Sequence, residues 1–133
     1  MMETKPMRLK ESTEEGIDVL TLEGEIDLHY APVLRSLLQG KLHVRCPALL
    51  LDLGRVSFID SAGLAAIIEY FRDSAEYDGV VCLTGLNENL RAVFEIVRLD
   101  QVIPIFPSIA DAVAAVKAGR VHPPEAALFR RPA

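Results

Sequence analysis

Apolar residues follow two different periods along this chain. Short, nearly continuous apolar runs, such as ALLLDL at 48–53 and VVCLT at 80–84, are typical of strands that are buried on both faces. Between these runs, apolar residues recur every three or four positions, which is typical of a helix with one buried side. The clearest stripe of this kind consists of Leu64, Ile67, Ile68 and Phe71.

The order of these patterns predicts an α/β fold. Segments 7–10 and 17–23 are strand-like and are joined by a turn at 12–16, so they should pair as an antiparallel hairpin. GEID at 24–27 should end the second strand. Strands and helices then alternate, which predicts a mixed, mainly parallel sheet of four to five strands with an antiparallel first strand, covered by about four helices. The remaining strands are expected at 48–53, 80–84 and 103–106, and the helices after Pro32, Ser61, Asn87 and Ser108.

Several local features refine this picture. Asn87 and Ser108 are expected to be helix N-caps, and Pro104 favours an edge position for the last strand. Asp52 is unusual in a buried strand and should reach a donor near the end of the strand. Cys82 lies in an apolar run and should be a buried thiol. The buried stripes of the first and third helices should be Leu34, Leu37 and Leu38, and Leu90, Val93, Phe94 and Val97.

Length and composition indicate one domain. The chain has 133 residues, of which 50% are apolar and 25% are charged, as in ordinary globular proteins. Residues 1–119 should form one folded domain, and residues 120–133, which include three prolines, should form a flexible tail. No long apolar surface stripe is evident beyond those that build the core, so a monomer or weak dimer is expected.

Charge and hydropathy narrow the classes of partner and the compartment. The net charge of −5 argues against nucleic acid as the direct partner. No apolar run approaches the roughly 18 residues of a membrane helix, and the start of the chain lacks the apolar core of a signal peptide. No membrane contact and a cytoplasmic location are therefore expected. Cys46 and Cys82 have neither C-x-x-C nor zinc-like spacing, so no metal site is expected.

The turn at 60–63, with the sequence Asp-Ser-Ala-Gly, carries the candidate chemistry. It leads from a central strand into a helix, and open α/β sheets place ligand and partner sites at such turns. The free N–H groups at a helix N-terminus also favour an anion. Taken singly, Asp60 or Ser61 is equally well explained as an N-cap, and Gly63 as a small residue where helix and sheet approach closely.

The longer string VSFIDSAGL at 56–64 resembles the signature of the STAS domain of bacterial anti-sigma factor antagonists. GEID followed by a helix with Ala31, Leu34 and Leu38 resembles the same family independently. In that family, a partner that is both kinase and anti-sigma factor phosphorylates the serine after the aspartate, which implies that Ser61 is the phosphoacceptor. Position 62 is Ala, where many members have a second Ser or Thr. The resemblance implies a partner-binding set of Asp27, Asp60, Ser61, Ala62, Gly63 and Leu64.

This resemblance implies a non-enzymatic, phosphorylation-switched interaction module. When dephosphorylated, it would bind a serine kinase that is also an anti-sigma factor, and so free a sigma factor. No cofactor of its own is expected, because ATP and Mg²⁺ would be bound by the kinase; a phosphatase is a further candidate partner. The alternative keeps the fold and changes the client, as in a STAS subunit of a lipid-transport or stress-signalling complex.

Enzymatic interpretations of Ser61 fit the sequence less well. The hydrolase motif G-x-S-x-G is missing, because Ile59 stands two residues before Ser61. No Walker loop or G-x-G-x-x-G marks a nucleotide site. A phosphate-accepting receiver domain needs a downstream lysine, and no lysine occurs between Lys41 and Lys117.

Overall fold

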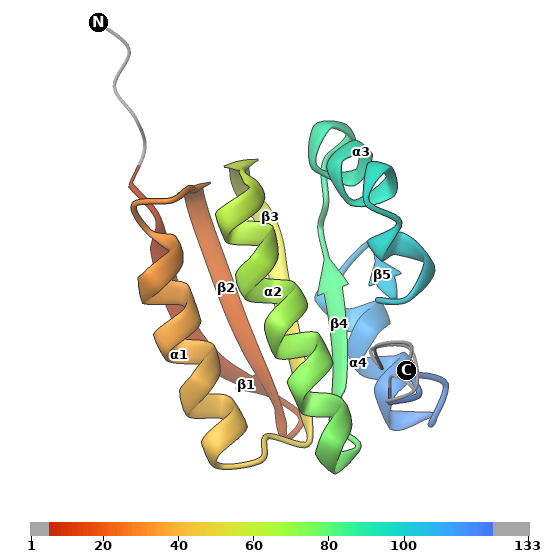
Figure 1. Cartoon of the computed structure of the whole chain (residues 1–133). Coiled ribbons are helices and arrows are strands. Elements are labelled where there is room, and N and C mark those ends of the chain that lie inside the picture. The colour runs from red at the N-terminus through yellow and green to blue at the C-terminus, as the bar shows by residue number, and fades with distance from the viewer. Residues whose placement is uncertain (1–5, 124–133) are drawn as a thin grey trace, which may run out of the picture.

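The computed structural model describes residues 6–123, which form a five-stranded sheet with helices on both faces (Figure 1). The strands lie side by side in chain order, with β1 antiparallel to β2 and all later pairs parallel. This confirms the predicted α/β class and the mixed, mainly parallel sheet. The elements are β1 (Arg8–Glu14), β2 (Ile17–Ile26), α1 (Ala31–His43), β3 (Ala48–Ile59), α2 (Ser61–Ser74), β4 (Val80–Thr84), α3 (Glu88–Ile96), β5 (Ile105–Phe106) and α4 (Ile109–Lys117), with short 3₁₀ turns at Ala75–Tyr77 and Leu99–Gln101.

The handedness of the strand–helix–strand connections determines which face of the sheet each helix covers. Each parallel connection from β2 to β5 moves one strand further in the same direction, and right-handed crossovers then place α1, α2 and α3 on one face. We call this the front face. Helix α4 follows the last strand and packs on β3, β4 and β5 from the back face. On β2, the residues that share this back-face core with α4 are Ile17 and Val19, at the start of the strand.

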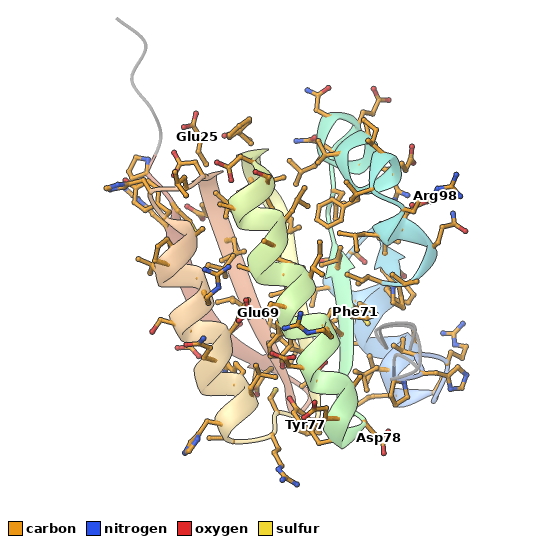
Figure 2. The ribbon with its side chains drawn as sticks, in the orientation of Figure 1. Glu25, Glu69, Phe71, Tyr77, Asp78 and Arg98 are labelled. Atoms are coloured by element: carbon orange, nitrogen blue, oxygen red, sulfur yellow. The ribbon has the colours of Figure 1, made fainter. Side chains whose placement is uncertain are left out.

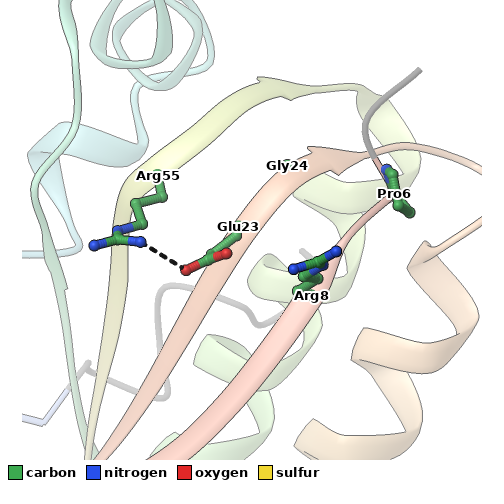
Figure 3. Close-up of a pocket in the computed structure, with 5 residues that line it drawn as sticks. All are labelled: Pro6, Arg8, Glu23, Gly24 and Arg55. Carbon is green, nitrogen blue, oxygen red and sulfur yellow. Dashed lines mark hydrogen bonds and ion pairs between the residues drawn. The ribbon is translucent and has the colours of Figure 1, made fainter. Parts of the chain in front are cut away.

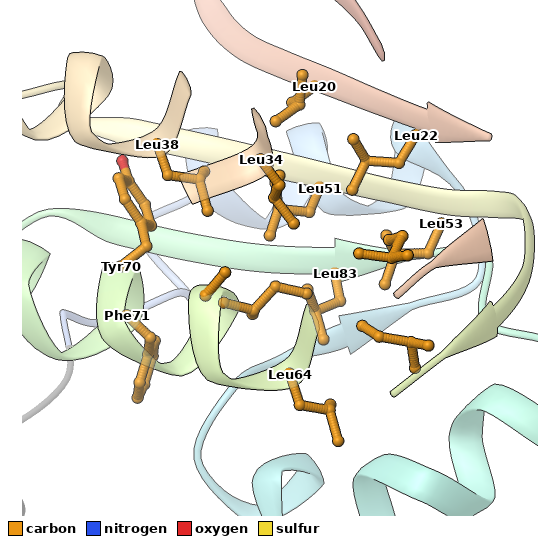
Figure 4. Close-up of a cluster of buried hydrophobic side chains, with 14 of the residues drawn as sticks. Leu20, Leu22, Leu34, Leu38, Leu51, Leu53, Leu64, Tyr70, Phe71 and Leu83 are labelled. Carbon is orange, nitrogen blue, oxygen red and sulfur yellow. The ribbon is translucent and has the colours of Figure 1, made fainter. Parts of the chain in front are cut away.

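Two cores of unequal size result. The main core lies between the sheet and the front helices and includes Leu20, Leu34, Leu51 and Leu83, all fully buried (Figure 4). The second core lies under α4 and joins residues of β2, β3 and β4 to Ala112 and Val113. Ile67 is 0% exposed, as the stripe on α2 predicts. Cys82 is also buried, as predicted.

The first hairpin differs from the prediction in its length. Strand β1 runs to Glu14 rather than residue 10, because the turn needs only Glu15 and Gly16, with φ of 50° and 82°. Positive φ at both central residues is the geometry of a tight two-residue hairpin turn. The predicted five-residue turn is therefore wrong, although the antiparallel pairing is confirmed.

GEID does not end the second strand, contrary to the prediction. Strand β2 continues through Ile26 and β3 continues to Ile59, with register shifts between Thr21 and Glu23 and between Gly24 and Glu25. Gly24, with φ of 86°, lies within this irregular stretch. Such bulges absorb extra residues without ending the ladder. Both strands therefore reach the turn that carries Ser61.

The predicted capping and polar contacts are confirmed. Asn87 accepts from the Leu90 N–H at 2.8 Å, and Ser108 accepts from the Asp111 N–H at 3.2 Å. Asp52 Oδ1 accepts from the Gly54 N–H and from the Thr84 hydroxyl at 3.1 and 3.3 Å. Strand β5 is at the edge of the sheet, but it begins after Pro104 rather than at residue 103.

The stripe predicted on the third helix is one residue too long. Helix α3 ends at Ile96, so Val97 lies beyond it and is 47% exposed rather than buried.

At the C-terminal end of the domain, Val121 packs into the second core, two residues past the predicted boundary at 119. Most of the predicted tail, 124–133, lies outside the described residues. Among residues 6–123, no helix combines the length and hydropathy needed to cross a membrane.

Candidate functional site

Asp60 is the central residue of the candidate site. It has extended backbone geometry and is the N-cap of α2, where its Oδ1 accepts from the N–H groups of Ala62 and Gly63 at 2.9 and 3.0 Å. Its Oδ2 accepts from the Leu28 N–H at 2.9 Å. The carboxylate therefore satisfies donors of α2 and, at the same time, holds the β2–α1 loop against the start of that helix.

Asp27 organises the same loop from its other side. Its Oδ1 accepts from the N–H groups of His29 and Tyr30 at 3.0 and 3.1 Å. Its carbonyl oxygen also accepts from Ala31 N–H at 2.8 Å, at the first turn of α1. Asp27 and Asp60, which the sequence places in one site, are thus joined through the backbone of Leu28. No sequence pattern indicated that link.

Gly63 permits the close approach of α2 to the ends of β2 and β3. A Cβ at this position would lie 2.7 Å from the carbonyl oxygen of Ile26 and 2.8 Å from the side chains of Ile26 and Ile59. Any larger residue would therefore push α2 away from the sheet. Gly63 and Leu64 are both buried. Within the predicted partner-binding set, they therefore pack beneath the turn and hold its position.

Ser61 is the exposed member of the turn. It is the first residue of α2, and within residues 6–123 its hydroxyl has no hydrogen-bond partner. Ala62 beside it is half-buried. A group added to the Ser61 oxygen would lie at the positive end of the α2 dipole, one residue from the Asp60 carboxylate. The hydroxyl is accessible to a modifying enzyme without any opening of the fold.

Two exposed apolar side chains lie on the segments that lead into this turn. Leu28, whose N–H is bound by Asp60, is 74% exposed, and Phe58, two residues before Asp60, is 48% exposed. No motif in the sequence marks either of them as a functional residue. Phe58 pairs with Glu25 near the ends of β3 and β2, and because strand residues alternate in direction it faces away from the main core, which contains its neighbour Ile59. Exposed apolar residues around a polar centre are typical of a protein contact.

The candidate site occupies one end of the molecule. Figure 2 shows Glu25 at the end of the sheet that carries the turn, and Tyr77 and Asp78 at the opposite end.

The end of the sheet opposite the turn holds a separate polar cluster, in which Lys41 Nζ donates to Asp18 at 2.9 Å and to Glu11 at 3.0 Å. The hydrogen bond from Lys41 lowers the pKa of Asp18. Burial raises the pKa of the nearby Cys46 thiol to about 11, so this thiol is protonated and unreactive at neutral pH.

Comparison with known proteins identifies the family of this chain. The STAS domain model matches residues 10–112. The anti-sigma-F factor antagonist RsfB of Mycobacterium tuberculosis is 32% identical over 109 residues, covering 80% of this chain and 86% of the relative. The crystal structure of an anti-sigma factor antagonist from Mycobacterium paratuberculosis superposes with a TM-score of 0.78 at 26% identity, covering 84% of this chain and 95% of that one.

A second solved structure shows the same fold in a modified protein. The phosphorylated form of SpoIIAA, a Bacillus cell fate determinant, has a TM-score of 0.65 at 22% identity, covering 84% of this chain and 99% of that one. The family match spans most of the described residues and contains the whole Asp60–Ser61 turn. The chain belongs to the STAS domain family.

Proposed function

We propose that this protein is an anti-sigma factor antagonist that is switched by phosphorylation of Ser61. The observation that carries the proposal is the exposed Ser61 hydroxyl at the first position of α2, on a turn that Asp60 fixes with three hydrogen bonds. A rigid, accessible hydroxyl is a good substrate for a partner kinase. When unmodified, the protein binds that kinase, which is also an anti-sigma factor, and so frees a sigma factor.

Phosphorylation would act by charge and bulk rather than by refolding. A phosphate adds about −1.5 to −2 charges at Ser61. The N-terminus of α2 favours that charge by roughly 0.3–1 kcal/mol, and the adjacent Asp60 opposes it by a comparable amount. The stability of the domain therefore changes little. At the partner contact, however, the dianion has volume and must lose water, and it has no pairing cation unless the partner supplies one, so we expect binding to be lost.

The contact surface consists of the Asp60–Ser61 turn and the loop that begins at Asp27. Both lie on one end of the molecule, with the exposed Leu28 and Phe58 beside them. The protein itself acts as a regulator rather than as an enzyme, and ATP and Mg²⁺ are bound by the kinase. A phosphatase resets the switch. The protein acts in the cytoplasm as a monomer or weak dimer.

Calorimetry with the cognate kinase tests this function directly. Ser61→Ala should bind the kinase and accept no phosphate. Ser61→Asp should bind at least roughly tenfold more weakly, a loss of about 1.4 kcal/mol. Ser36 offers a matched control, because it is another exposed helical serine, on α1. Ser36→Ala and Ser36→Asp should leave binding and phosphate transfer unchanged.

Two results would contradict the switch. One is tight binding by Ser61→Asp, and the other is a phosphate found on a residue other than Ser61. A pull-down from the native cell distinguishes an anti-sigma factor client from the alternative, a lipid-transport or stress-signalling complex. Recovery of a transporter or stress-complex subunit, with no kinase, would favour that alternative over an anti-sigma factor.

A further inference from the structure

Strand β1 leaves one side of the sheet open. It spans Arg8–Glu14 and pairs only with β2, so the N–H and C=O groups on its outer side have no strand partner among residues 6–123. The strand is seven residues long and mostly exposed. An open edge of this length is a template on which another extended chain can pair.

The front side of this edge is apolar around Leu9, whereas Glu11 further along is bound by Lys41. A groove of about 460 Å³ runs between β1 and α1 and is lined by Leu9, Pro32, Val33, Ser36 and Leu37. Val33 is 51% exposed there, while Leu9 and Leu37 are partly buried against the main core. Figure 1 shows α1 alongside β1 at this margin of the sheet. The groove lies where the side chains of an added strand would point forward.

The back side of the same edge is positively charged at Arg8 and Lys10, whereas Glu14 stands at the far end of the strand. Arg8 and Lys10 alternate with Leu9 along the strand, so they point to the opposite face. Among residues 6–123 neither cation forms an ion pair. Glu23, which lies opposite Arg8 in the register, is bound instead by Arg55 at 3.3 Å. Figure 3 shows this arrangement around a cavity of about 260 Å³, with Arg8 next to the Glu23–Arg55 pair but not joined to it.

From these three features we infer that β1 binds an extended segment of a partner protein in which apolar and acidic side chains alternate. The segment would add a sixth strand to the sheet at the outer edge of β1. Its main chain would pair with the open backbone groups, its apolar side chains would enter the groove at Leu9 and Val33, and its carboxylates would meet Arg8 and Lys10. This surface is separate from the Ser61 turn, and the inference does not depend on the proposed switch.

The pattern of side chains favours this occupant over a second copy of the chain. A second β1 would offer the groove Leu9 as its sole apolar front residue, followed by Glu11 and Thr13. On the back face it would bring a single carboxylate, Glu14, together with its own Arg8 and Lys10. An acidic, alternating segment satisfies both sides of the edge at once.

The test is an NMR titration of the full chain with a blocked heptapeptide that alternates glutamate and valine. Saturable shifts should appear at β1 and at the groove face of α1. Two control peptides should bind at least tenfold more weakly: one alternates lysine and valine, and the other has the original composition with all glutamates before all valines. Arg8→Glu combined with Lys10→Glu should weaken binding at least tenfold and reverse the preference toward the lysine–valine peptide.

Matched variants separate the site from general effects of charge. Arg91→Glu with Arg98→Glu, two exposed cations outside β1, should change affinity less than twofold. Val33→Glu should weaken binding at least fivefold, while Val44→Glu, which is exposed beyond the end of α1, should not. The inference would be overturned if all three peptides bound equally, or if no saturable shifts appeared at millimolar peptide. It would also be overturned by shifts centred on the Ser61 turn or by self-association through β1.

Discussion

The double role of Asp60 leads to a prediction that separates its two oxygens. Asparagine is as good an N-cap as aspartate, so Asp60→Asn should keep the bonds to Ala62 and Gly63 through its remaining carbonyl oxygen. Its amide nitrogen is a donor and cannot accept from the Leu28 N–H. Loss of that bond costs about 0.5–1.5 kcal/mol, and loss of the charge at the helix N-terminus about 0.3–1 kcal/mol. Asp60→Ala also removes the cap and should cost about 1 kcal/mol more.

Urea unfolding and amide hydrogen exchange measure these effects together. In Asp60→Asn, the Leu28 amide should exchange faster while the Ala62 and Gly63 amides stay protected. In Asp60→Ala, all three should exchange faster. Asp78→Asn is the matched control, because Asp78 is exposed at the opposite end of the molecule and should change neither quantity. Unchanged exchange at Leu28 in both Asp60 variants would refute the idea that this carboxylate holds the loop.

Three further predictions follow from burial and charge. Ile67→Ala should lower the free energy of unfolding by about 2–5 kcal/mol in urea titrations, because Ile67 is fully buried; an unchanged midpoint would contradict the packing of α2. Gly63→Ala should cost about 1–3 kcal/mol in the same titration, since its methyl group would collide with the Ile26 carbonyl; equal or higher stability would show that α2 shifts freely. The Lys41 hydrogen bond lowers the pKa of Asp18, so this carboxylate stabilises the fold above its unfolded pKa near 3.8 and that contribution is lost as the pH falls through its folded pKa. Burial opposes the charge of Lys41, but its bonds to Asp18 and Glu11 outweigh burial and raise its pKa, so its contribution is present below pH 10.5 and lost as the pH rises through the folded pKa. Urea midpoints across pH should show both losses in the natural protein and not in Lys41→Met, and identical profiles would contradict the assignment.

The elements that could be predicted from sequence are those whose cause is local. The N-caps Asp60, Asn87 and Ser108 act within three residues of their own position, so a short string of letters contains the whole signal. The buried face of α2 is predicted for the same reason, because one helix period fixes which residues share a side.

The features that could not be predicted arise between distant segments. The link from Asp60 to Leu28 joins residues 32 positions apart, and no local pattern encodes it. The two bulges that let β2 and β3 continue to the Ser61 turn arise from pairing between segments distant in the chain, and no local pattern marks their positions. From sequence, GEID indicates a strand break because it begins with a glycine. In the structure Gly24 does adopt positive φ, yet pairing with the neighbouring β3 continues past it.

The unequal cores on the two faces of the sheet also determine which part of the domain unfolds first. The fully buried side chains of α4 are Ala112, Val113 and Ala115, with Ile109 and Val116 only partly buried, whereas α2 buries the larger Ile67, Tyr70 and Phe71. The free energy of opening should therefore be lower for α4 than for α2, which makes α4 and the segment to Val121 a separate unit of partial unfolding. Ser61 belongs to the more resistant unit. A fusion or pulling force applied beyond Val121 would act first on the back of the sheet and leave the Ser61 turn folded.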